Sequence, residues 1–218
     1  VVLTGEGADE FMAGYDIFKE DRIRRFWARQ PQSALRPRLL RRLYPDIAGL
    51  SNSSNAYLAA FFGQGLCDVK NPHYSHAIRW GNNARTWRFF SDEVMRELRR
   101  QEAVTLEAIS CPPEFRDWDA LSRAQYLEAA VFLSEYLLSS QGDRVAMAHS
   151  VEARFPFLDH RVVEFSNRLP AALKLRGLTD KYLLRRVASD WLPAEVWQRP
   201  KRPYRAPIAR SFLRSEEH

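Results

Sequence analysis

The stretch Val1-Val2-Leu3-Thr4-Gly5-Glu6-Gly7-Ala8-Asp9-Glu10 is the part of the chain that best indicates its fold. Its first four residues form an apolar, β-branched run typical of the end of a buried strand, and the two glycines predict a tight turn. From Ala8 the pattern is helical to about Arg29, before Pro31. We therefore expect a strand–turn–helix unit. In open α/β sheets, nucleotides bind beside such turns, at the carboxyl ends of the strands.

This turn is unusual because it carries three acids, Glu6, Asp9 and Glu10. Its glycines let the backbone approach a ligand, and the free amides of a helix start suit a phosphate. The acids repel phosphate unless a hard cation such as Mg²⁺ lies between them. Neither standard phosphate loop matches: the Rossmann pattern needs glycine where Glu10 stands, and a Walker loop needs Gly-Lys-Ser or Gly-Lys-Thr. A structural turn whose acids cap the helix is the alternative.

The remaining sequence predicts a mostly helical chain. Helices are expected over residues 33–44, 55–62, 91–100, 119–139 (the longest), 143–149, 159–169 and 181–191, with a short helical turn after residue 193 and a loop over 71–88. The only predicted strand is the one at the beginning of the chain. Because a lone strand is not stable, its sheet partners are expected upstream of Val1.

Two further segments could carry chemistry. Residues 142–159 place ionisable groups among small and apolar residues, which is typical of a buried, hydrogen-bonded network, although simple pairing and helix capping would also explain them. In Asp180-Lys181-Tyr182-Leu183-Leu184-Arg185-Arg186, Lys181 and Arg185 lie one helical turn apart. They share a face, so both are candidates for binding an anion. The basic loop 199–207 either closes over a substrate or lies on the surface.

Composition places the 218 residues in the globular class, with 45% hydrophobic residues and a formal charge of +6. That charge favours anionic partners. The arginine-rich runs at 21–25 and 36–42 are interpreted as solvated faces of amphipathic helices. Cys67 and Cys111 fit neither a disulfide framework nor a zinc site. No apolar run reaches the roughly 18 residues of a membrane span. We expect a soluble, cytoplasmic protein with no membrane partner.

Taken in order, segments 5–15, 143–159 and 181–207 resemble the synthetase domain of the asparagine synthetase family, and the resemblance spans residues 1–218. It implies an α/β ATP pyrophosphatase domain of the adenine-nucleotide α-hydrolase type, of which this mostly α chain is the C-terminal part. The implied reaction uses ATP and Mg²⁺ to adenylate the side-chain carboxylate of aspartate. Ammonia from glutamine then gives asparagine, with AMP and pyrophosphate as the other products.

The resemblance also implies roles for individual residues. Thr4 and Gly5 match the segment that touches ATP, and Glu6 matches the acid tied to formation of β-aspartyl-AMP and its reaction with ammonia. Asp9 would hold Mg²⁺-pyrophosphate, and Lys181 matches the lysine that stabilises charge on the departing pyrophosphate. These roles agree with the chemistry, because adenylation needs cations where the pyrophosphate charge develops. Arg185 is added as a nucleotide contact because it shares a face with Lys181.

Two parts of such an enzyme are absent from the sequence. They are the Ser-Gly-Gly-x-Asp-Ser pyrophosphate loop and the N-terminal glutaminase domain with its cysteine nucleophile. Both are expected upstream of Val1, in the parent chain, so this fragment by itself is expected to be inactive. The oligomeric state is left open, with a homodimer as one option.

Three alternatives are kept. Relatives of the same fold make β-lactams or amidate sugar and peptide precursors; Glu6 favours asparagine formation, because β-lactam-forming relatives tend to carry tyrosine there. A basic helical module that binds nucleic acid would explain the arginine runs, but no stacking aromatic pattern or binding motif accompanies them, so no nucleic-acid partner is expected. A helical partner-binding domain without catalysis predicts that Glu6→Ala leaves function intact.

Overall fold

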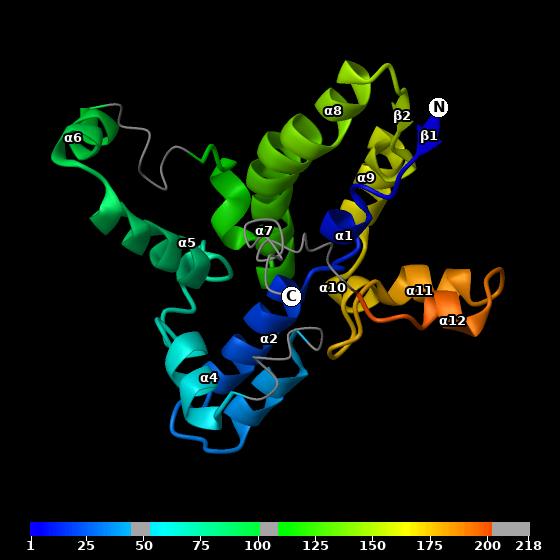
Figure 1. Cartoon of the computed structure of the whole chain (residues 1–218). Helices are drawn as coiled ribbons and strands as arrows, with labels where there is room; N and C mark the ends of the chain where they lie inside the picture. Colours follow the sequence, from blue (N-terminus) through cyan, green and yellow to red (C-terminus); the bar gives the residue numbers. More distant parts are fainter. Residues whose placement is uncertain (45–52, 101–108, 202–218) are drawn as a thin grey trace, which may run out of the picture.

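The structure is a computed structural model that describes residues 1–44, 53–100 and 109–201. Most of these residues are helical, as predicted, and the strands form a two-stranded parallel sheet (Figure 1). Strand β1 (Val2–Leu3) pairs with β2 (Ala153–Arg154), so that Val2 lies opposite Ala153. The expectation of a single strand whose partners all lie upstream is therefore wrong. Strand β2 has only two residues, too few for a period-2 pattern to reveal it.

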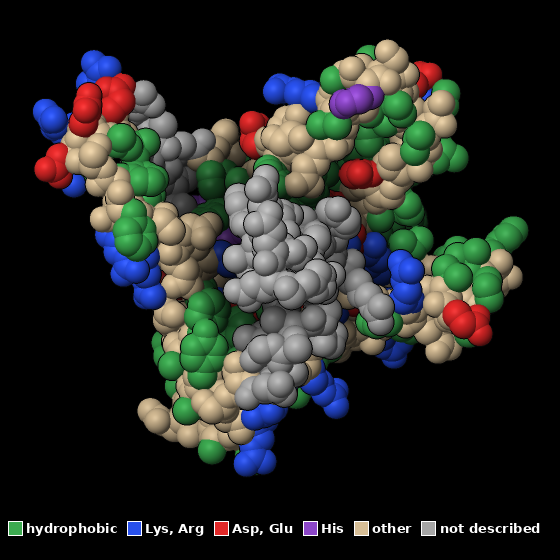
Figure 2. Space-filling view, viewed as in Figure 1, with side chains coloured by type: hydrophobic (Ala, Val, Ile, Leu, Met, Phe, Trp, Pro, Cys, Tyr) green, Lys and Arg blue, Asp and Glu red, His purple; other side chains and the backbone are tan. Residues whose placement is uncertain are grey.

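The two strands leave apolar side chains uncovered in the described part of the chain. Val1 is 84% exposed and Leu3 is 74% exposed. Figure 2 shows hydrophobic side chains over the end of the molecule that carries the strands and α8 (Asp143–Ala148). Because β1 and β2 run parallel, the turn after β1 lies beside the segment that follows β2.

The predicted helix from Ala8 to Arg29 is interrupted. The structure contains α1 (Ala8–Phe11) and α2 (Asp16–Ala28), separated by a turn in which buried Ala13 has a φ of 58°. Gly14 follows, and its N–H donates to the carbonyl oxygen of Asp9 at 2.7 Å. Because of this break, the acidic turn is followed by its own short helix, α1.

The elements between α2 and residue 100 were predicted in part. They are η1 (Arg36–Arg42), α4 (Asn55–Phe62), α5 (Ala77–Ala84), η2 (Arg85–Phe89) and α6 (Asp92–Arg100). Helix α4 has the predicted bounds, and α6 begins after Ser91, whose hydroxyl accepts from the N–H of Val94. The predicted helix over 33–44 is a shorter 3₁₀ helix. The predicted loop over 71–88 is wrong, because α5 and η2 form there despite the Gly and Asn residues.

The second half contains the longest helical segment. Its elements are η4 (Pro113–Asp117), α7 (Ala120–Leu127), η5 (Glu128–Gln141), α8, η6 (Pro156–Leu158), α9 (His160–Arg168), α10 (Ala171–Lys174), α11 (Tyr182–Ala188) and α12 (Ala194–Trp197). Helix α7 continues directly into the π-helical η5, so the predicted long helix is confirmed and extends to Gln141. Asp119 and Asp159 cap α7 and α9, since their side chains accept from backbone N–H groups at the beginning of each helix.

Helix α2 is the central scaffold because both of its sides are packed. One side joins η1 and α4 in an apolar cluster; its members are Ile23, Trp27, Leu40, Leu43, Leu58, Phe62 and Leu66. The other side packs against α7 and the residue after α10; this cluster contains Ala13, Ile17, Phe18, Leu121, Ala124 and Leu175. Because burial of apolar surface contributes about 25 cal/mol per Å², packing on two sides holds α2 firmly in place.

The predicted solvated face of residues 21–25 is wrong, because none of these five residues is exposed. Arg24 is only 1% exposed, and its guanidinium donates to the carbonyl oxygens of Phe62, Gln64 and Tyr74. A buried arginine is tolerated where its donors are satisfied in this way. Arg24 therefore ties α2 to the segment that follows α4.

The segment 142–159 also differs from expectation, because its charged groups lie at the surface. Glu152 pairs with Arg154, and these side chains are 50% and 60% exposed. His149 is also exposed, and its Nδ1 contacts the carbonyl oxygen of Val145 at 2.8 Å. The alternative of simple pairing and capping describes this segment better than a buried network does. No described helix combines the length and apolar composition needed to cross a membrane.

Candidate functional site

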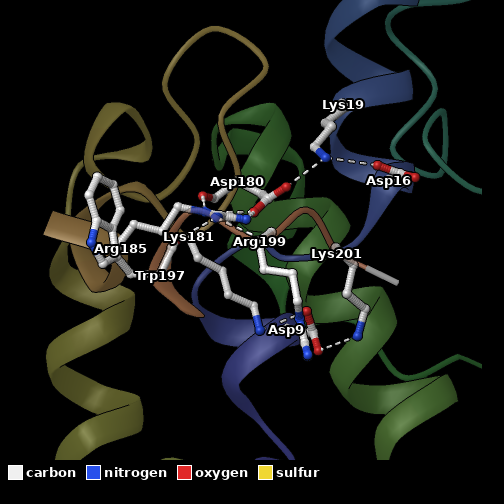
Figure 3. Close-up of polar contacts among 9 residues, drawn as sticks. All are labelled: Asp9, Asp16, Lys19, Asp180, Lys181, Arg185, Trp197, Arg199 and Lys201. Atoms are coloured by element: carbon white, nitrogen blue, oxygen red, sulfur yellow. Dashed lines mark hydrogen bonds and ion pairs between the residues drawn. The ribbon is translucent and has the colours of Figure 1, made fainter. Parts of the chain in front are cut away.

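The structure brings Asp9 and Lys181 together from opposite ends of the chain. Lys181 Nζ lies 2.9 Å from Asp9 Oδ1 (Figure 3). Lys181 is the residue that precedes α11, with a φ of 46° and a ψ of 37°, the left-handed region. Thr179 and Asp180 are of residue types that often cap helices, but neither side chain caps α11. Asp180 instead forms ion pairs with Lys19 and Arg185.

A second lysine contacts the same carboxylate. Lys201, in the segment that follows α12, places its Nζ 2.7 Å from Asp9 Oδ2 and 5.3 Å from the centre of the Tyr15 ring. Asp9 therefore lies between two ammonium groups, one on each oxygen. The sequence indicated Lys201 only as part of a basic loop; its pairing with Asp9 depends on a tertiary contact that no local pattern reveals.

Gly14 makes this arrangement possible. A Cβ atom at position 14 would lie 1.9 Å from Asp9 Oδ1 and 2.3 Å from Lys181 Cε. Real Cβ atoms do not come so close to other atoms, so any larger residue displaces these side chains. Only glycine leaves room for the ion pair, a requirement that the sequence alone did not indicate.

Asp180 connects α2 to the beginning of α11. Its Oδ2 lies 2.6 Å from Lys19 Nζ, and its Oδ1 lies 2.5 Å from Arg185 Nη2. Lys19 also contacts Asp16 at 2.9 Å. Burial opposes ionisation of Asp180, but the hydrogen bonds from Lys19 and Arg185 outweigh it and lower the pKa of this carboxyl. Asp180 is therefore a fixed, charged group directly before Lys181.

Arg185 does not accompany Lys181 toward Asp9. Besides Asp180, its guanidinium donates to the carbonyl oxygens of Trp197 at 2.7 Å and Arg199 at 3.0 Å (Figure 3). The two side chains diverge because Lys181 lies outside the helix in a left-handed conformation, whereas Arg185 lies within α11. The assignment of Arg185 to nucleotide binding stays a prediction, and the structure shows a role in tying α11 to α12.

A pocket of about 420 Å³ opens beside these residues, a size suited to a small-molecule ligand. Its charged lining combines one acid with cations from α11 and the 199–201 segment: Asp180, Lys181, Arg185, Arg199 and Lys201. Phe157 and Trp197 contribute aromatic surface. Positive charge exceeds negative charge around this pocket, which favours an anionic ligand.

The other predicted residues lie in the turn between β1 and α1. Among the residues that the structure describes, Thr4 Oγ1 and Glu6 Oε2 are buried and have no hydrogen-bond partner. Gly5 is exposed, and a Cβ there would meet nothing within 4 Å. Gly7 has a φ of 90° and packs closely against Leu158. Within the described part of the chain, no hydrogen bond or ion pair joins Glu6 to Lys181, so their convergence on one ligand stays a prediction.

The fit to a phosphate ligand with a metal ion is partial. Lys181 and Lys201 are suitable partners for phosphate oxygens, and the unpaired oxygens of Thr4 and Glu6 leave capacity for further polar contacts. Within residues 1–44, 53–100 and 109–201, no three His, Cys, Asp or Glu side chains gather as a metal site. Helix α1 has four residues, so its dipole is weaker than the predicted long helix would supply.

The whole chain is similar to known proteins. The family model described as asparagine synthase matches residues 1–218. A candidate glutamine-hydrolysing asparagine synthetase of Mycobacterium tuberculosis is 32% identical over all of this chain and 31% of its own length. Glutamine-hydrolysing asparagine synthetase 1 of Bacillus subtilis is 27% identical over 99% of this chain and 32% of its own length. Amidase chyE of Penicillium rubens is 28% identical over 95% of this chain and 32% of its own length.

No solved structure matches the chain. The chain spans about a third of the length of these curated relatives. The family match covers every residue from the acidic turn to the basic segment, and the resemblance inferred from the three sequence segments is confirmed. The chain belongs to the asparagine synthase family.

Proposed function

We propose that this chain is the C-terminal part of a synthetase domain that uses ATP to convert the side-chain carboxylate of aspartate to the amide of asparagine. The observation that supports this most directly is the placement of Lys181 and Lys201 on the two oxygens of Asp9, beside a cationic pocket. The family match and the names of the bacterial relatives support the same reaction class.

Lys181 and Lys201 are the residues that would meet the growing charge of pyrophosphate. ATP, when bound, supplies the activating adenylyl group. Each lysine is half-buried and already oriented by Asp9, so little reorganisation is needed when charge develops. A preorganised cation of this kind contributes a few kcal/mol to a transition state, that is, about 10²–10³ in rate.

Asp9 is the acid proposed to hold Mg²⁺. Its carboxylate is the only ligand assigned to the ion here, and the remaining ligands would come from water and phosphate oxygens, as is usual for Mg²⁺. Thr4 and Gly5 are proposed to contact the nucleotide, and the open space above Gly5 suits a close backbone approach.

Glu6 is proposed as the group that accepts a proton from attacking ammonia. Its Oε2 is buried and has no hydrogen-bond partner in the described part of the chain. Burying a carboxylate oxygen without a partner costs free energy, which suggests that a ligand supplies the missing contact. A ligand amine or hydroxyl would satisfy it. A carboxylate within hydrogen-bond reach of the reacting nitrogen is a suitable base.

The proposal also covers the rest of the protein. Residues 1–218 would complete an ATP pyrophosphatase domain in which further strands extend the sheet beyond β1. An N-terminal glutaminase domain would supply ammonia from glutamine, and the cytoplasm would be the site of synthesis. All residues of the proposed site come from one copy of the protein, so the site does not require a homodimer.

The test is pyrophosphate release by the full-length protein with ATP and Mg²⁺. We expect release that depends on L-aspartate and on either glutamine or ammonia, with asparagine as the amide product. Glu6→Gln should abolish asparagine formation, whereas Glu114→Gln, a change at an exposed position, should not. Release with no response to aspartate would exclude asparagine synthesis.

A second candidate is amide chemistry on another carboxylate. It is favoured by the fungal relatives named amidases, which are as similar to this chain as the Bacillus protein is. A panel of carboxylates in the same assay separates the two. An acceptor that gives more than about tenfold higher kcat/KM than aspartate would assign the protein to this candidate.

A further inference from the structure

We propose that Lys19 is a positioning residue for Lys181. It holds Asp180 in place and thereby fixes the left-handed backbone conformation of Lys181, from which the Lys181 side chain reaches Asp9. The inference rests on the proposed function of Lys181. Lys19 lies on α2, outside the pocket lining, and neither the sequence motifs nor the proposed reaction assigns it a role.

The contacts of Lys19 are short and shielded. Its Nζ lies 2.6 Å from Asp180 Oδ2 and 2.9 Å from Asp16 Oδ1, and the three side chains are 12%, 6% and 9% exposed. Pairs shielded from water are screened less by salt than surface pairs are. Burial lowers the pKa of Lys19, but the hydrogen bonds to Asp180 and Asp16 outweigh it and raise this pKa, so Lys19 stays charged.

Asp180 is restrained from two sides. Lys19 holds Oδ2 from α2, and Arg185 holds Oδ1 from α11. Arg185 belongs to the element that begins after Lys181, so it cannot by itself anchor that element to the rest of the protein. Lys19 supplies the anchor, because α2 is packed on both sides by the apolar clusters.

The conformation of Lys181 needs such an anchor. A φ of 46° is unfavourable for a residue with a Cβ atom, and it persists only where the surroundings hold it. Asp180 is the preceding residue, so the ion pair acts one peptide bond away from the strained position. Without Lys19, the backbone at Lys181 can leave the left-handed conformation, and the ammonium group of Lys181 then moves away from Asp9.

The test compares three variants of the full-length protein. Lys19→Met removes the charge at similar length, Lys19→Arg keeps it, and Lys70→Met makes the same replacement at an exposed lysine. We expect Lys19→Met to lower kcat for pyrophosphate release at least about tenfold with a KM for ATP within about threefold. Lys19→Arg should keep about half of the activity or more, and Lys70→Met should match the wild type.

A double-variant cycle separates positioning from general destabilisation. If Lys19 acts through Lys181, Lys19→Met in the Lys181→Ala background should cause no further loss of kcat. Equal, multiplicative losses in both backgrounds would overturn the proposal. If Lys19→Met does not fold, as judged by circular dichroism, Lys19→Gln replaces it, because it also removes the charge that holds Asp180 and its polar amide is easier to accommodate beside two carboxylates.

One readout does not depend on the reaction. Acetic anhydride labels lysine amines, and mass spectrometry follows the labelling of Lys181, whose side chain is 22% exposed. We expect Lys181 to be labelled several-fold faster in Lys19→Met than in the wild type or Lys70→Met. If the wild type releases no pyrophosphate, the proposed function fails while this comparison still decides the positioning. Unchanged labelling of Lys181 would overturn it.

Discussion

Asp9 and Lys181 form an ion pair at 2.9 Å across a space that exists only because residue 14 has no side chain. The break between α1 and α2 brings Gly14 under the carboxylate, and the left-handed corner before α11 brings the ammonium group to the same point. Two local features that are far apart in the sequence therefore define one polar contact.

Gly14→Ala is expected to separate Asp9 from Lys181 without unfolding the protein. The new Cβ would meet only the ends of two flexible side chains, which can move at small cost. We expect pyrophosphate release to fall about tenfold to a hundredfold because the lysine loses its orientation. Gly81→Ala is the control, since nothing lies within 4 Å of its Cβ and Ala favours a helix. Full activity in Gly14→Ala would contradict this account.

Gly7→Ala is expected to destabilise the turn between β1 and α1. Gly7 has a φ of 90°, and an added Cβ would lie 2.4 Å from a side-chain carbon of Leu158. Gly65 separates the two effects, because it also has a positive φ, 58°, but has open space around it. We expect a loss of about 1 kcal/mol for Gly65→Ala and roughly 2–4 kcal/mol for Gly7→Ala, measured by urea unfolding. Equal losses would show that the contact with Leu158 is unimportant.

The sequence predicted the elements that local signals control. Helices α4, α6 and α7 begin after Ser54, Ser91 and Asp119, whose side chains accept backbone N–H groups. These caps act within one turn of helix, so no tertiary information is needed to place them. The acidic turn and Lys181 were identified in the same way, from residue types at short spacing, and the family resemblance followed from them.

The features that the sequence did not predict depend on contacts between distant segments. Strand β2 exists because β1 pairs with it, and the break before α2 places Ala13 in the core with a φ that alanine rarely adopts. No local pattern distinguishes Lys201 and Lys19 from other basic residues; their roles depend on Asp9 and Asp180, which the fold places beside them. Tertiary packing outweighs local propensity at all four positions.

Glu10 is expected to make stability depend on pH. Its side chain is 1% exposed, and burial raises its pKa above 4.5 even though Tyr15 donates a hydrogen bond to Oε1 at 2.7 Å. The native state therefore holds this proton more tightly than the unfolded state does. Stability is greatest below pH 4.5 as far as Glu10 contributes, and this contribution is lost as the pH rises through the folded pKa.

Glu10→Gln tests this because the amide oxygen can still accept from Tyr15. The free energy of unfolding of the variant relative to the wild type should rise as the pH increases from 4.5 and then level off above the folded pKa. Each tenfold difference in proton affinity between native and unfolded states corresponds to about 1.4 kcal/mol. Glu114→Gln, at an exposed position, gives the baseline. A difference between Glu10→Gln and wild type that falls with rising pH has the opposite sign and would contradict the prediction.

Arg24 is expected to be the charged residue whose loss is most harmful to the α2–α4 side of the protein. Its guanidinium satisfies three carbonyl oxygens at 2.8–3.0 Å and lies 4.1 Å from the centre of the Tyr74 ring. Arg24→Met fills similar space but leaves these acceptors without a donor, which should cost roughly 3–5 kcal/mol.

Arg24→Lys distinguishes the donors from the charge, because one ammonium group cannot reach three carbonyls arranged around a planar fork. We expect it to lose roughly 2 kcal/mol or more. Arg29→Met, at the exposed position directly after α2, should stay within about 0.5 kcal/mol of the wild type. Chemical denaturation gives all three values. If Arg24→Met costs less than about 1 kcal/mol, the carbonyls find other donors, and Arg24 does not tie α2 to the segment after α4.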